Sequence, residues 1–155
     1  MNKKILAIFA LLIVVASVSA VSAFDLGDLF GSNDQKNETV TIEGVDFNVP
    51  GDFKEDTTNT TDKMLAPFKE QGANITAKGF TKDDSGIVIG VMNVTNGLSN
   101  EQTLELLGGK ETTINNVTGY LSHDEGQTLF NFEKNDHLVL ISASDEKIIG
   151  EFVMA

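Results

Sequence analysis

The sequence has no cysteine, no tryptophan and no arginine, and only two of its 155 residues are proline. Without cysteine, the chain cannot form disulfide bonds, thiolate metal sites, a cysteine nucleophile or a lipidated N-terminal cysteine. Ten of the eleven aromatic residues are phenylalanine. We therefore expect a core built from Phe, Ile, Leu and Val.

Positive charge is also scarce, because 11 lysines face 23 acidic residues and the formal net charge is −12. The first 23 residues hold two lysines and no acid, so the remainder carries nine lysines against 23 acids, a net charge of −14. Phosphate binding needs clustered cations, which argues against nucleic acid and anionic membrane surfaces as partners. The negative charge favours cations, basic partners or simple solubility, and the expected partner is an unknown protein, cation or small molecule.

The first 24 residues, MNKKILAIFALLIVVASVSAVSAF, have the order of an export signal: two lysines, an apolar run and small residues. Cleavage is predicted after Ala23, although Ala20 ends an identical Val-Ser-Ala triplet. The alternative is an uncleaved anchor, because Ile5–Val21 is 17 residues long, at the lower limit for spanning a bilayer. Both interpretations place the chain outside the cytoplasm, secreted or at the cell surface, with membrane contact only through an uncleaved leader.

After the signal peptide, residues 1–23, the polar stretch 24–37 is predicted to be a flexible linker. The remaining residues, 38–155, suit a single domain.

Five Asn-x-Thr triplets match the acceptor pattern for N-glycosylation in exported proteins, at Asn37, Asn59, Asn74, Asn93 and Asn116. They predict a glycoprotein, provided that the host glycosylates. The alternative is that Asn, Gly and Thr recur there because these residues suit turns at strand ends.

Alternating apolar residues predict an antiparallel sheet of about six or seven strands. The stretch from Val40 to Val49 predicts a hairpin around Gly44, and residues 75–80 and 87–94 predict two strands joined by a turn at 83–86. Residues 87–94 are apolar on both faces, which favours a central strand. Three further strands are predicted over 111–123, bent near Asn115–Asn116, over 127–133 and over 137–143.

Two helices are predicted, near 99–108 and 144–154. Ser99 and Gln102 form a capping box for the first helix, which Gly108 ends. The second helix has one apolar face from Ile148 to Val153. Residues 52–72 are predicted to be a loop with at most a short helical turn, because Pro67 limits it.

The predicted fold class is therefore α+β, with both helices on one face of a meandering sheet. A pure β-sandwich is the alternative, but it leaves both apolar helix faces unexplained.

The opening VTIEGVDFNVPGDF and the close INNVTGYLSHDEGQTLFNFEKNDHLVLISASDEKIIGEFV follow an export leader that ends in Val-Ser-Ala-Phe. Together they resemble small secreted proteins of methanogenic archaea, over most of the chain. The Phe-x-Val-Pro-Gly-x-Phe stretch is also similar to the α/β sandwiches of the Mog1 and PsbP type. The shared motifs are structural, so the resemblance implies an archaeal envelope or exterior setting and no catalytic residue.

No catalytic constellation is found in the sequence. His123 and His137 are expected at opposite ends of one strand, roughly 20 Å apart, too far to share a metal. The Gly-x-Ser-x-Gly motif and phosphate-binding loops are absent. The acidic turns at Asp83–Asp84 and His123–Gly126 could hold calcium through carboxylates and carbonyls, but they lack the spacing of a 12-residue calcium loop and are interpreted as solvated turns.

We therefore expect no catalytic, cofactor or metal site. The sequence favours an exported, acidic, non-enzymatic domain of the cell envelope or the secreted fraction, with a binding or scaffolding role. One alternative is an extracellular carrier with a Phe-lined cleft for a small ligand. The other is a small carboxylate-dependent hydrolase, which needs acids that converge with perturbed pKa values.

Overall fold

The computed structural model describes residues 36–57, 60–70, 74–94, 99–124 and 126–155. The predicted signal peptide, most of the predicted linker and Asn59 lie outside these residues. Strands and helices follow in the order β1 (Glu38–Ile42), β2 (Val45–Val49), β3 (Lys54–Glu55), α2 (Thr60–Glu70), β4 (Asn74–Lys82), β5 (Ser85–Asn93), α3 (Asn100–Leu107), β6 (Lys110–Ile114), β7 (Val117–Asp124), β8 (Gln127–Lys134), β9 (His137–Ala143) and α4 (Glu146–Phe152).

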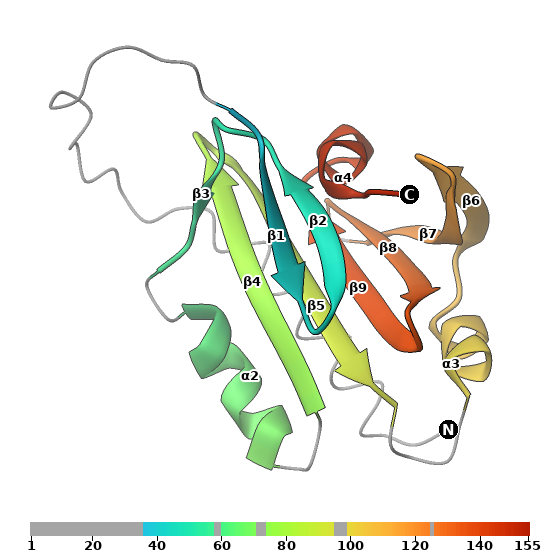
Figure 1. Ribbon diagram of the computed structural model, residues 1–155. Coiled ribbons are helices and arrows are strands. Elements are labelled where there is room, and N and C mark those ends of the chain that lie inside the picture. The colour runs from blue at the N-terminus through green and yellow to red at the C-terminus, as the bar shows by residue number, and fades with distance from the viewer. Residues whose placement is uncertain (1–35, 58–59, 71–73, 95–98, 125) are drawn as a thin grey trace, which may run out of the picture.

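Seven strands form one antiparallel sheet in the order β3-β4-β5-β9-β8-β7-β6, and β1 and β2 form a separate hairpin that lies across it (Figure 1). The predicted α+β fold class is confirmed. The prediction of residues 87–94 as a central strand is confirmed, because β5 lies inside the sheet between β4 and β9 and is buried on both faces, and β9 occupies the middle position. From Leu138 to Ala143 every residue of β9 is buried, as a strand covered on both faces requires.

The sheet has a core on each face, as the alternation along β5 shows. Ile87, Ile89 and Val91 face the β1–β2 hairpin and α4, whereas Val88 and Met92 belong to a second cluster. That second cluster includes Leu65 of α2 and Leu104 of α3 on the opposite face. The molecule is therefore built in three layers. The seven-stranded sheet lies in the middle, the β1–β2 hairpin and α4 cover one face, and α2 and α3 cover the other.

Helices α3 and α4 confirm the two predicted helices, but they lie on opposite faces of the sheet and not on one. The predicted capping box of α3 is present: the Ser99 side chain accepts from Gln102 N, and the Gln102 side chain accepts from Ser99 N. The apolar face of α4 is buried at Ile148, Ile149 and Phe152. Its N-cap is Asp145, whose carboxylate accepts from Ile148 N at 3.0 Å.

Helix α2 was not predicted. A loop with at most a short helical turn was expected here, but residues 60–70 form an eleven-residue helix that continues through Pro67. A proline inside a helix removes one hydrogen bond and costs about 3 kcal/mol. Packing opposes that cost here, because Thr61 and Leu65, one helical turn apart, are both buried against the sheet. Gly79 of β4 makes room, since a Cβ there would lie 3.2 Å from Thr61 Oγ1.

The single bent strand predicted over residues 111–123 is also wrong. Asn115 and Asn116 both have positive φ, 49° and 64°, which is the signature of a type I′ turn. The chain therefore reverses there, and Ile114 pairs with Val117 to close the β6–β7 hairpin.

In the part of the chain that the structure describes, no helix combines the length and the apolar character needed to cross a membrane.

Candidate functional site

A polar pocket opens where the end of β2, the turn after it, the end of β4 and α4 meet. Its volume is about 510 Å³, and its wall consists of Asn37, Asn48, Pro50, Gly51, Asp52, Lys82 and Glu151. A tight turn shapes this wall, because Phe53 N donates to Pro50 O at 2.9 Å. The Pro50-Gly51 pair, which fits a turn, therefore places Asp52 in the wall of the pocket.

An ion pair between Lys82 and Asp52 forms the charged centre of the pocket. The two side chains are 40% and 37% exposed. The hydrogen bond from Lys82 lowers the pKa of the Asp52 carboxyl below its usual value, and the same bond raises the pKa of Lys82. The Lys82 ammonium also lies 5.8 Å from the centre of the buried Phe53 ring, within cation–π range.

Further groups fix the walls of the pocket. The Asn48 amide donates to the backbone oxygen of Glu151 at 2.7 Å, which ties β2 to α4. The carboxylates of Glu151 and Asp83 add to the rise in the pKa of Lys82 by their negative charge. Asn37 Oδ1 accepts from Gly51 N at 3.4 Å.

The arrangement suits polar recognition better than proton transfer. A general acid or base works best when its pKa lies near the working pH. The shifts at Asp52 and Lys82 move both groups away from neutrality, so at pH 7 the first stays ionised and the second stays protonated. Together they offer a carboxylate acceptor and an ammonium donor, beside the side-chain amides of Asn37 and Asn48.

Each histidine lies where the sequence predicted it. His123 pairs with Thr128 at the start of β8, and His137 pairs with Lys134 at its end. His123 Nδ1 lies 3.1 Å from Thr128 Oγ1, and His137 Nδ1 lies 2.6 Å from the oxygen of Asn135. The structure therefore keeps the two rings at opposite ends of one strand.

The acidic turn at Asp83–Asp84 joins β4 to β5, and both residues are exposed. Within residues 36–57, 60–70, 74–94, 99–124 and 126–155, no group of three or more His, Asp or Glu side chains could hold a metal ion.

Four of the five predicted glycosylation sites are described. Asn37 precedes β1, Asn74 begins β4, Asn93 ends β5, and Asn116 occupies the β6–β7 turn. The side chain of Asn93 is half-buried, and the other three are exposed. Asn74 and Asn93 are brought together as direct partners in the β4–β5 ladder.

Sequence reasoning did not find the pocket. Its residues come from four separated stretches, and only Asn37 and the Pro50-Gly51 turn carried a recognisable pattern. No spacing along the chain pairs Asp52 with Lys82, since the contact depends on where β3 and β4 run.

Comparison with protein-family models, curated proteins and solved structures found no match for this chain.

Proposed function

We propose that the chain is an exported, acidic, non-enzymatic domain of the cell envelope or the secreted fraction, with a binding or scaffolding role. The observation that carries this proposal is the Asp52–Lys82 ion pair in the wall of a polar pocket. Each side chain of the pair stabilises the charged form of the other. The leader and the five Asn-x-Thr triplets support the exported setting, and the resemblance to secreted archaeal proteins supports an archaeal envelope.

The packing of the phenylalanines favours this role over a carrier with a Phe-lined cleft. Phe53 meets Phe152 edge to face with ring centres 5.0 Å apart, and Phe80 meets Phe152 at 5.4 Å. These rings fill the core between the sheet, the hairpin and α4.

The pocket chemistry favours the same role over a carboxylate-dependent hydrolase. A catalytic acid needs a raised pKa, as burial among apolar groups provides. The hydrogen bond from Lys82 lowers the pKa of Asp52 instead.

The exported setting is tested by expressing the full chain in an archaeal host and measuring its intact mass after fractionation. We expect a protein outside the cytoplasm that begins at Phe24 and carries added sugar mass. A chain that begins at Met1, bears no sugar and stays in the cytosol contradicts the proposal.

The binding role is tested with the pocket variant Lys82→Met and the surface variant Lys110→Met as a matched control. The full chain is used to capture partners from the envelope fraction of the same host. We expect the first variant to lose a partner that the wild type and the control retain. Equal capture by all three proteins contradicts a role for the pocket.

A further inference from the structure

Two predicted glycosylation sites face each other at one end of the β4–β5 hairpin. Asn74 is the first residue of β4, Asn93 is the last residue of β5, and the two are direct partners in the ladder. Directly opposed residues of an antiparallel pair project to the same face, with Cβ atoms about 4.5–5.5 Å apart. Any sugars on the two side chains would therefore start from almost the same point.

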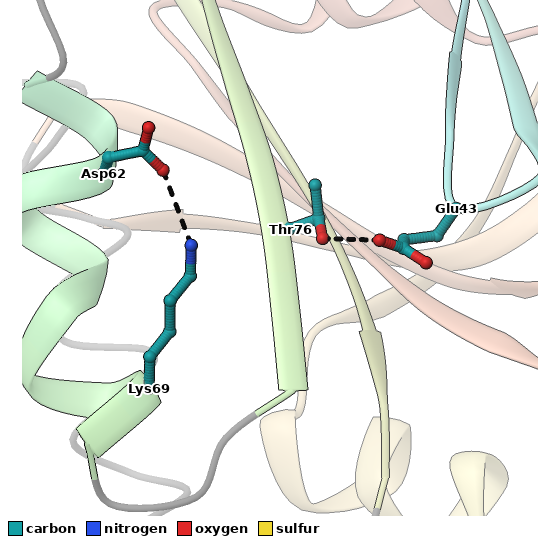
Figure 2. Close-up of polar contacts among 4 residues, drawn as sticks. All are labelled: Glu43, Asp62, Lys69 and Thr76. Carbon is teal, nitrogen blue, oxygen red and sulfur yellow. Dashed lines mark hydrogen bonds and ion pairs between the residues drawn. The ribbon is translucent and has the colours of Figure 1, made fainter.

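The β1–β2 turn lies over part of the sheet face onto which both asparagine side chains project. Thr76 lies two residues along β4 and so shares this face with Asn74. Its hydroxyl donates to the carboxylate of Glu43 at 2.6 Å (Figure 2). Glu43 belongs to the β1–β2 turn, which Asn135 holds in place by donating to Gly44 O at 2.9 Å. The turn therefore stands beside the pair of asparagines.

We propose that Asn74 and Asn93 form one glycosylation locus, which carries a single N-linked glycan at a time. This inference rests on the proposed function, because it requires an exported chain in a host that glycosylates. A sugar ring with its substituents is wider than the spacing between the two Cβ atoms, and the β1–β2 turn limits how far a second sugar can lean away.

A chain with both sugars would have to separate the ends of β4 and β5. The next pair in the ladder is Ile75 and Met92, which are 2% and 8% exposed in the second core cluster. Separation would expose these buried apolar side chains to water, which is unfavourable. Double occupancy is therefore disfavoured by the fold itself.

Asn74 is the expected carrier of the glycan, since its side chain is exposed and that of Asn93 is half-buried. In the folded protein the hydroxyl of Thr76, the third residue of this acceptor triplet, is bound to Glu43. The first sugar is therefore attached to Asn74 before the β1–β2 turn docks against β4, and the docked turn then hinders attachment of a second sugar at Asn93.

One peptide can report the state of both asparagines. The sequence has no glutamate between Glu70 and Glu101, so cleavage after glutamate releases residues 71–101 with Asn74, Asn93 and no other acceptor triplet. The full chain is expressed in an N-glycosylating host that exports it, and this peptide is analysed by intact glycopeptide mass spectrometry. We expect singly modified peptide, mostly at Asn74, with the doubly modified form several-fold below the product of the two single occupancies.

Two variants complete the test. Asn74→Gln should raise the occupancy of Asn93 several-fold, whereas Asn116→Gln, which removes an acceptor in a distant turn, should leave both occupancies unchanged. Doubly modified peptide at the product of the single occupancies overturns the inference, as does a bare peptide from chains that carry sugar at Asn37 or Asn116. These two results leave the exported glycoprotein intact, whereas a chain without any sugar in the cytosol overturns both proposals.

Discussion

The side-chain amide of Asn115 donates a hydrogen bond to the backbone oxygen of Gly150 at 2.6 Å, across 35 residues of sequence. The same amide reaches the oxygen of Val153 at 3.0 Å. The last carbonyl groups of a helix have no partner within the helix, so they need donors from elsewhere. The β6–β7 turn thus supplies the donor that ends α4.

Replacement of Asn115 by Asp should destabilise the protein by about 2 kcal/mol, because a carboxylate cannot donate and faces two carbonyl oxygens. Asp still tolerates positive φ, so the change tests the hydrogen bonds and not the turn. The measurement is urea unfolding of protein made in a host without glycosylation. Asn116→Asp, at the exposed neighbour in the same turn, is the control and should change stability by less than about 0.5 kcal/mol. Equal losses in the two variants would remove the role assigned to Asn115.

Gly119 of β7 should not accept even one methyl group. A Cβ there would lie 2.5 Å from the backbone oxygen of Asn131 and 2.8 Å from Phe132 Cβ, and neither atom can move without shifting β8. We expect Gly119→Ala to lower the free energy of unfolding by about 3 kcal/mol, as overpacking does.

Gly150→Ala is the matched control, because the nearest atom to its Cβ would be 3.8 Å away and the residue lies in α4. Alanine is favoured over glycine in a helix, so this variant should gain about 0.5–1 kcal/mol. Thermal unfolding of both variants and of the wild type measures whether each change raises or lowers stability. A Gly119→Ala protein as stable as the wild type would show that β7 is free to shift.

Ser142 of β9 is fully buried, and its hydroxyl has no hydrogen-bond partner among the residues that the structure describes. A buried polar group without a partner is unfavourable, so Ser142→Ala should raise stability by about 1 kcal/mol. Thr103→Val provides the contrast, since the Thr103 hydroxyl is equally buried but donates to Ser99 O at 2.9 Å. That variant should lose about 1 kcal/mol. Chemical denaturation measures both, and a destabilised Ser142→Ala would reveal a partner for the hydroxyl.

The Asp52–Lys82 pair should make stability depend on pH at both extremes. The pKa of Asp52 is lowered from 3.8 by the hydrogen bond from Lys82, so its contribution is present above pH 3.8 and disappears as pH falls through the folded pKa. The pKa of Lys82 is raised from 10.5, so its contribution is present below pH 10.5 and disappears as pH rises through the folded pKa.

The melting temperature of wild type should exceed that of Asp52→Asn at pH 7, and the gap should narrow in acid. It should also narrow with added salt, because the pair is exposed. A gap that is the same in acid and at neutral pH would mean that the pair contributes no stability.

The hairpins that alternate strictly were predictable from sequence. Val45, Phe47 and Val49 alternate with polar residues, and all three are buried on one face of β2. The β6–β7 hairpin was missed because Asn115-Asn116 lacks the glycine that usually marks a type I′ turn. Asn tolerates positive φ by itself, and the hydrogen bond from Asn115 to the end of α4 is a tertiary contact that no local pattern encodes.

Tertiary packing decided the features that local patterns did not. Burial of Leu65 in the second core cluster stabilises α2 despite Pro67, because the helix covers apolar side chains on that face of the sheet. The pocket depends on the meeting of Asp52 and Lys82, which no local periodicity encodes. The capping box at Ser99 was predictable because both of its partners lie within four residues.

The position of β9 governs when this chain can fold. Residues 137–143 are made after all the other strands of the sheet, yet they join β5 to β8 in its middle. Before they arrive, strands β3 to β5 and β6 to β8 are two fragments without a shared ladder, and pairings between distant strands form slowly. If the chain is exported N-terminus first, its sheet would thus stay incomplete until residues 137–143 had emerged from the translocation channel.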